Sequence, residues 1–200
     1  YNMTGEGARA VVPSRQNQAA AGELQLGANG DFGYATTDAG GHFTLSHATS
    51  YIWFDPWSQE VDARLVSVSL ATADRTIALC GTRTFDGGGF GAATGGEYAV
   101  TLSFGAEGVA LPASGGDTRV FAAAVVYPVD CSATEVHVTY TFADGSVYTE
   151  TRPGRKLEAG ATYRLTSEIT KRAGGALEIE AGEADDEPVC LKYGGSEVRS

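Results

Sequence analysis

The chain has 200 residues with 14 basic and 25 acidic side chains, and its formal net charge is −11. Nucleic acids and anionic lipid surfaces reward clustered lysine and arginine, so neither is expected as a partner. The 27 glycines and the single methionine favour a turn-rich β fold over a helical one.

The first part of the chain is predicted to be a polar leader followed by two strands. Residues 1–30 are small and polar, and we expect them to be extended or disordered apart from a short strand at residues 8–12. Strands follow at residues 42–45 and 49–54. The second should stop at Asp55-Pro56, because proline cannot donate a hydrogen bond to the ladder.

In the middle of the chain, strands alternate with a glycine-rich loop. The sequences RLVSVSL at residues 64–70 and YAVTLSF at residues 98–104 have the period of two that half-buried strands show. Between them, Cys80-Gly81 is a predicted strand end and residues 85–96 are a predicted loop. VFAAAVVY at residues 120–127 is a continuous apolar run, which predicts a central strand covered on both faces.

Residues 134–169 predict three strands joined by two turns. Apolar and polar residues alternate at residues 136–142. On the return strand, Val147, Thr149 and Thr151 alternate with Tyr148 and Glu150. The turn between them contains Gly145, which can take the positive φ that a tight hairpin needs. A second turn, Leu-Glu-Ala-Gly, leads to a third strand at residues 163–169.

These elements predict an all-β chain of roughly nine to eleven short strands, arranged as an antiparallel β-sandwich. We divide the chain into three segments. Residues 1–40 are a leader with the first strand, and residues 41–170 are the sandwich domain. Residues 171–200 are a short C-terminal strand with an acidic tail, or the remnant of a further domain.

Side chains that carry catalysis or bind metals form no recognisable motif. The histidines His42, His47 and His137 occur without a Gly-x-Ser-x-Gly elbow, so we predict no catalytic residue and no enzyme activity. The acidic run at residues 183–187 and the sequence Asp-Gly-Ser at residues 144–146 lack the spacing of a calcium loop. No metal and no cofactor are therefore predicted.

The three cysteines are Cys80, Cys131 and Cys190, which lie far apart without a CxxC pair, so a zinc site is not expected. Because three is an odd number, at least one is free or pairs between chains, and a bond between Cys80 and Cys131 is left open. The chain begins at Tyr1 without a visible signal peptide, and we expect an N-terminal segment to have been removed.

An aromatic group on the strand at residues 49–54 allows two interpretations. Tyr51 and Trp53 point to one face of a strand, and Trp57 follows shortly after. Exposed, these rings form a platform on which a sugar can stack. Buried, they belong to the core or pack against a neighbouring segment, as large apolar side chains usually do.

The order of these blocks resembles one protein family. The sequence contains, in order, LSHATSYIWF, LVSVSL, ALCG, a glycine-rich loop, VFAAAVVYP, TYTFADGSVYTE and KLEAGATYRLT. His47-Ala48 before an aromatic-rich strand and the LEAGATY sequence at residues 157–163 are the most telling pieces. Residues 41–169 are thus similar to the N-terminal domain of the fimbrillin family, surface lipoproteins of anaerobic Gram-negative bacteria that include the subunits of type V pili.

The resemblance implies a transthyretin-like or immunoglobulin-like sandwich, export, and display at the cell surface or in fimbriae. It implies an outer-membrane anchor through an N-terminal lipid that is later removed. The implied partners are other pilus subunits or further copies of the chain, bound by strand exchange, and host or glycan ligands. Family subunits often carry a second sandwich, and the residues after Ile169 are too few for one.

The resemblance also implies proteolytic processing after an arginine near the N-terminus. The candidates are Arg15 and Arg9, and a cut at Arg15 would remove the strand at residues 8–12 whole. The alternative is that both arginines are ordinary solvated residues. We therefore expect the protein to be a structural or adhesive subunit of a pilus-like assembly. The alternative is a stand-alone surface lipoprotein that binds glycans.

Overall fold

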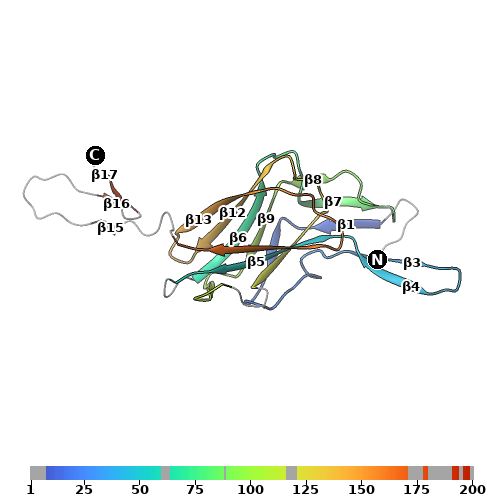
Figure 1. The fold of residues 1–200 in the computed structure, drawn as a ribbon, viewed down its shortest axis with the longest axis horizontal. Helices are drawn as coiled ribbons and strands as arrows, with labels where there is room; N and C mark the ends of the chain where they lie inside the picture. Colours follow the sequence, from blue (N-terminus) through green and yellow to red (C-terminus); the bar gives the residue numbers. More distant parts are fainter. Residues whose placement is uncertain are drawn as a thin grey trace, which may run out of the picture.

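The computed structural model describes residues 8–59, 64–87, 89–115 and 121–170 and three short strands beyond them. All regular elements of these residues are β-strands, and two sheets share one core (Figure 1). In the described part of the chain, no helix has the length and apolar character needed to cross a bilayer. The predicted fold class, an all-β sandwich, is confirmed.

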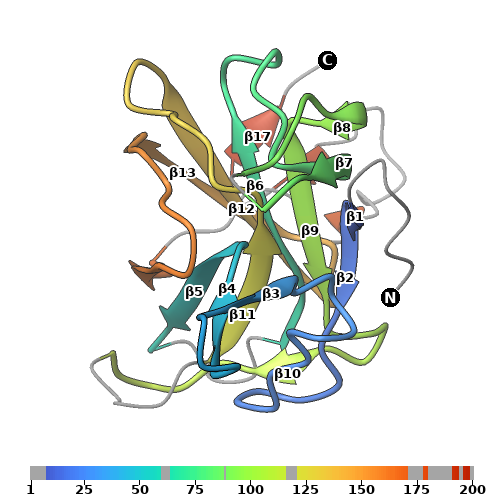
Figure 2. The same cartoon turned by 90° about the vertical axis from the view of Figure 1, so that its right-hand side faces the viewer.

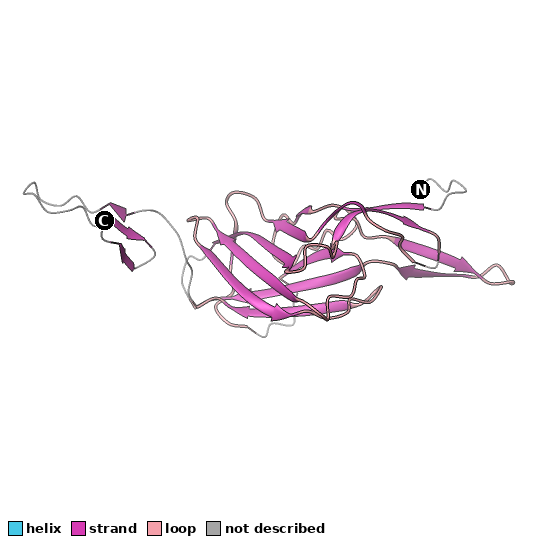
Figure 3. Ribbon diagram, turned by 90° about the horizontal axis from the view of Figure 1, so that it is seen from above, coloured by secondary structure: helices cyan, strands magenta, loops and turns pink. Residues whose placement is uncertain are grey.

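The strands follow one another as β1 (Ala8–Val12), β2 (Arg15–Asn17), β3 (Gly33–Thr37), β4 (Phe43–His47), β5 (Ser50–Trp57), β6 (Arg64–Thr72), β7 (Cys80–Phe85), β8 (Thr94–Glu97), β9 (Ala99–Ser103), β10 (Val109–Ala110), β11 (Ala122–Val126), β12 (Glu135–Phe142), β13 (Val147–Pro153), β14 (Thr162–Glu168), β15 (Glu178–Ile179), β16 (Leu191–Tyr193) and β17 (Ser196–Val198). The larger sheet has the order β13-β12-β6-β9-β2 with β10 on β6, and the smaller has the order β11-β5-β14. Three further sheets are β1-β7-β8, β3-β4 and β15-β16-β17. The hairpin β3-β4 projects from the sandwich (Figures 1 and 3).

The main core lies between the inward faces of the two sheets. In β12, every second residue from Val138 to Phe142 is buried, as the alternation predicts. In β6, Leu65 is buried together with Val68 and Leu70, although a strict period of two would turn it outward. The pairing of β6 with β12 shifts register at this end, and such a bulge moves a side chain to the other face.

β5 continues through Pro56 to Trp57, so the prediction that the strand stops at the proline is wrong. The carbonyl of Trp57 accepts a hydrogen bond from the amide of Ile169, on the side of β14. Pro56, the alternate residue, therefore faces the side of β11, whose pairing with β5 ends at Phe54. A proline at this position removes no ladder hydrogen bond.

We predicted that the strands at residues 134–169 follow one another through two turns in an antiparallel fold. The structure differs at the third strand, because β14 does not pair with β13. The β12–β13 turn places Gly145 at a φ of 79°, in agreement with the prediction. The chain then crosses to the smaller sheet, where β14 pairs in parallel with β5 from Thr162↔Tyr51 to Glu168↔Trp57. As a result, β13 and β14 are the edges of two different sheets.

Residues 8–30 contain the strand that we predicted at residues 8–12 and a second strand, β2, in the stretch that we predicted to be extended or disordered. β1 coincides with the expected strand at residues 8–12, and β2 joins the larger sheet by pairing with β9. Figure 2 shows β1 and β2, in blue, following each other alongside β9. Cys80-Gly81 begins β7 rather than ending a strand, and β8 lies in the predicted loop at residues 85–96. The division into three segments stays a prediction.

Candidate functional site

The strand β1 occupies a sheet edge and fills part of a core. It pairs antiparallel with β7, from Ala8↔Phe85 to Val12↔Gly81, at the end of the sheet β1-β7-β8. Ala10 and Val12 are 1% and 0% exposed, whereas Val11 between them is 53% exposed. β1 therefore satisfies the backbone groups of β7 and also places two side chains inside the protein.

The side chains of β1 cover a second hydrophobic cluster. We call this the β1 cluster, and its buried members are Ala10, Val12, Tyr51, Cys80, Val125 and Tyr127. Rings extend it outward: the centroid of Phe90 lies 4.7 Å from that of Tyr127 and 5.1 Å from that of Phe85. Without β1, this apolar surface would lose its cover.

The hydroxyl of Tyr127 contacts the backbones of both β1 and β7. The Oη of Tyr127 lies 3.1 Å from the carbonyl oxygens of both Ala10 and Gly81, to which it can donate. Burial raises the pKa of Tyr127, so the donor keeps its proton over the physiological range. The guanidinium of Arg83 lies 4.6 Å from the centre of the same ring. Ala10 is thus held in two ways: its carbonyl accepts a hydrogen bond from Tyr127, and its side chain packs in the β1 cluster.

The strand β2, which follows β1, holds the protein in a different way. The amide side chain of Gln16 donates to the carbonyl of Val125 (2.7 Å) and accepts from the amide of Val125 (2.9 Å). Gln18 makes the same two types of bond, to the carbonyl of Phe121 (2.8 Å) and from the amide of Ala123 (3.3 Å).

Both glutamines are 1% exposed, so these bonds are shielded from water. We call them the glutamine ladder. β11 is buried throughout, but it is an edge of its sheet and not the central strand that its apolar sequence predicted. The glutamine ladder takes the place of a missing neighbouring strand along β11, which explains how an edge strand can be fully buried. Only the spacing of two between the glutamines pointed to this role in the sequence.

The two candidate processing residues lie within strands. Arg9 is the second residue of β1, opposite Thr84, and its side chain is exposed. Arg15 is the first residue of β2, opposite Thr101, and is also exposed. The carbonyl of the preceding residue, Ser14, accepts a hydrogen bond of 2.7 Å from the amide of Thr101. Neither arginine lies in a mobile leader, and a protease would reach the bond after Arg15 only when β2 opens locally.

The aromatic residues of β5 do not form an exposed platform. Tyr51 is 6% exposed and belongs to the β1 cluster, with Trp53 packed against it. The indole of Trp57 is half-buried against Gly115, where an added Cβ would lie 2.5 Å from its nitrogen. Of the two interpretations of these rings, the geometry supports burial.

Sequence reasoning missed a polar cluster around Asp31. The carboxylate accepts hydrogen bonds from the hydroxyls of Tyr51 (2.6 Å) and Thr49 (2.8 Å), and Nδ1 of His47 lies 3.1 Å from it. Burial disfavours the charge of Asp31, but the bonds from Tyr51, Thr49 and His47 together outweigh it and lower its pKa. Burial, with the bond to Asp31, raises the pKa of Tyr51.

The other polar candidates have structural partners. His42 lies beside Asp38, and His137 beside Thr151. Asp144 accepts bonds from the amide and hydroxyl of Ser146 and so shapes the turn. The absence of enzyme activity stays a prediction.

Cys80 and Cys131 are buried free thiols, and burial raises the pKa of each to about 11. The question of a bond between these two is thereby answered, because both are unpaired. Cys190 and the acidic run at residues 183–187 lie outside the described residues.

Comparisons with known proteins give distant structural neighbours. No family model and no curated protein matches the sequence. A candidate cell adhesion protein from Bacteroides ovatus matches over 82% of this chain and 64% of its own, with a TM-score of 0.40 and 17% identity. A second one, from Bacteroides fragilis, matches over 78% and 48%, with a TM-score of 0.40 and 15% identity. The chain thus spans less than two thirds of either neighbour, and at this level of similarity no shared function follows.

Proposed function

We propose that this chain is a structural or adhesive subunit of a pilus-like assembly on the bacterial surface. In this proposal β1 is removed by proteolysis, and an extended segment of another subunit takes its place on β7. The single observation that carries the proposal is the position of β1, which combines an edge place in the sheet with two buried side chains. The resemblance of the sequence to fimbrillins agrees with it.

The driving force would come from the surface that β1 leaves. An open edge on β7 would expose unpaired backbone groups, which an incoming strand satisfies. Burying a side chain of the size of Val12 contributes roughly 1.5–3 kcal/mol. A chain without β1 would therefore bind any segment that restores these contacts.

Arg15 is the processing site in this proposal, because a cut there releases β1 intact. A cut at Arg9 would divide β1 and leave Ala10 and Val12 attached to the body. After the cut at Arg15, Gln16 would be the new first residue and would remain bound to Val125 through its side chain. Surface location and lipid anchoring belong to the proposal, as the resemblance implies them.

Limited digestion of the full chain with trypsin tests the proposal. We expect a product that begins at Gln16, from which residues 1–15 have been released. In size-exclusion chromatography this product should oligomerise or bind a labelled peptide copy of residues 8–15. The variant Arg15→Gln should stay uncut at this bond and monomeric, whereas Arg9→Gln should behave as the parent. A product that begins at Gln16, has lost the fragment, and neither assembles nor binds the peptide would refute strand exchange.

A further inference from the structure

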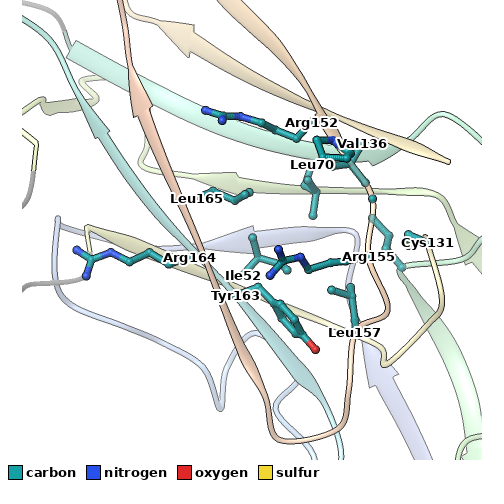
Figure 4. A pocket seen from close by; sticks show the side chains of 13 residues that line it. Ile52, Leu70, Cys131, Val136, Arg152, Arg155, Leu157, Tyr163, Arg164 and Leu165 are labelled. Atoms are coloured by element: carbon teal, nitrogen blue, oxygen red, sulfur yellow. The ribbon is translucent and has the colours of Figure 1, made fainter. Parts of the chain in front are cut away.

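A second candidate site lies between the edge strands β13 and β14. It is a cavity of about 260 Å³ with an apolar floor, formed chiefly by Ile52, Leu70, Val136, Leu157 and Leu165 (Figure 4). Because β13 and β14 belong to different sheets, no ladder closes the sandwich between them. The cavity is separate from the β1 cluster, since its floor belongs to the main core.

Two of the three arginines around this cavity already have partners. Arg152 lies 2.9 Å from a carboxylate oxygen of Glu150 and donates to the carbonyl of Thr166 at 3.1 Å. Arg164 pairs with Asp55. Figure 4 shows both guanidinium groups pointing away from the centre of the cavity. Their charges are therefore balanced outside it.

The third arginine, Arg155, is placed differently. Its side chain reaches across the apolar floor, and its guanidinium carbon lies 5.7 Å from the ring centre of Tyr163 (Figure 4). Among the carboxylates of the described residues, none forms an ion pair with it. A cation above an apolar floor matches a ligand with one negative charge and an apolar body.

The remaining walls do not oppose such a ligand. The thiol of Cys131 lines the cavity, and burial raises its pKa to about 11, so it carries no charge near neutral pH. Glu150, beside Arg152, accepts a hydrogen bond of 2.5 Å from Ser167, whose hydroxyl lies 2.8 Å from that of Tyr140. These polar groups satisfy one another.

We propose that this cavity binds a medium-chain alkyl carboxylate. The carboxylate pairs with Arg155, for which a guanidinium is well suited, and the alkyl chain lies on Ile52, Leu70 and Leu165. At about 30 Å³ for each water-sized group, the cavity has room for roughly eight or nine carbon atoms. This inference does not depend on strand exchange.

Calorimetric titration of the full chain with carboxylates of increasing length tests the inference. We expect affinity to rise about fourfold for each added methylene, and to level off near nonanoate. Arg155→Gln should weaken octanoate binding by roughly tenfold or more. Arg75→Gln is the matched control, because Arg75 lies 5.1 Å from the ring centre of Tyr98, away from the cavity. Leu165→Phe, which fills the floor, should weaken octanoate in the same way.

Several outcomes would overturn the inference. Equal binding of octylamine and octanoate would remove the role of Arg155, as would equal effects of Arg155→Gln and Arg75→Gln. An affinity that keeps rising to myristate would indicate adsorption to the surface rather than a cavity of this size. Arg155-dependent binding of a peptide with alternating Leu and Glu, without binding of octanoate, would assign the cavity to an acidic strand instead.

Discussion

The N-terminal segment covers the backbone edges of two strands, β7 and β11, but it does so by different means. β7 is covered by the backbone of β1, through the regular ladder from Ala8 to Val12. β11 is covered by the side-chain amides of Gln16 and Gln18. A backbone ladder can be re-formed by any extended segment, whereas the glutamine ladder needs two amides at fixed positions. The difference indicates that one cover is exchangeable and the other permanent, with Arg15 between them.

The largest effect is expected from placing a charge on β11, whose Val125 has its backbone in the glutamine ladder and its side chain in the β1 cluster. Val125 is 0% exposed, and its backbone is held by Gln16. Val125→Asp would bury a carboxylate without a partner, which costs several kcal/mol and should prevent folding. Circular dichroism and thermal melting measure this directly. A soluble Val125→Asp chain with the parent melting point would show that β11 is not part of the core.

A smaller but specific loss is expected from breaking the glutamine ladder. Gln16→Leu keeps a side chain of similar size but removes its amide group, so the amide and carbonyl of Val125 lose their partners. At about 1–3 kcal/mol for each of the two unsatisfied buried groups, the variant should lose roughly 2–6 kcal/mol of unfolding free energy. Gln25→Leu is the control, because Gln25 is exposed. Equal stability of the two variants in urea would mean that water can replace the ladder.

The stability of the exchangeable cover, β1, should depend on the volume of its buried side chains and not on a particular side-chain amide. Val12→Ala removes buried methyl groups beneath β1 and should cost about 1–2 kcal/mol, whereas Val11→Ala on the same strand should cost almost nothing. In addition, Val12→Ala should speed the tryptic cut after Arg15, because it weakens the strand beside it. If both variants are cut at the parent rate, β1 does not protect that bond.

The sequence predicts well those features that depend on neighbouring residues. The alternation in β12 and β13 and the turn at Gly145 are local, and each was read correctly. The parallel pairing of β14 with β5 is not local, because these strands are far apart in the sequence. Which strand β14 pairs with depends on how the two sheets are arranged in space, and the sequence of β14 does not contain this information. The bulge that turns Leu65 inward is set by the register of β6 against β12, which the β6 sequence alone does not contain.

The candidate site was predictable only in part. β1 was found at its observed residues because a short apolar run is visible within a polar stretch. The glutamine ladder was missed because Gln16 and Val125 are 109 residues apart, and an isolated glutamine looks like a surface residue. The aromatic residues of β5 left both interpretations open, and only the packing of Tyr51 in the β1 cluster distinguishes them.

The smallest expected effect concerns pH, and it separates the two covers most cleanly. The β1 side contains an ionised group, since Asp31 holds the hydroxyl of Tyr51 in the β1 cluster. The glutamine ladder contains no titratable side chain. Because the pKa of Asp31 is lowered in the folded protein, its contribution to stability is complete above the ordinary aspartate value of about 3.9. That contribution is lost as the pH falls through the lowered folded value.

Hydrogen exchange between about pH 5 and pH 2.5 can resolve this difference. After correction for the intrinsic exchange rate, protection of the β7 amides opposite β1 should decrease at the acidic end. Protection of the Ala123 amide, which donates to Gln18 and lies outside the β1 cluster, should follow global stability alone. In Asp31→Asn the acid-dependent part at β7 should disappear, because the asparagine does not titrate. Equal acid sensitivity of β7 and β11 in both proteins would show that the two covers open together, and the separation between an exchangeable and a permanent edge would then fail.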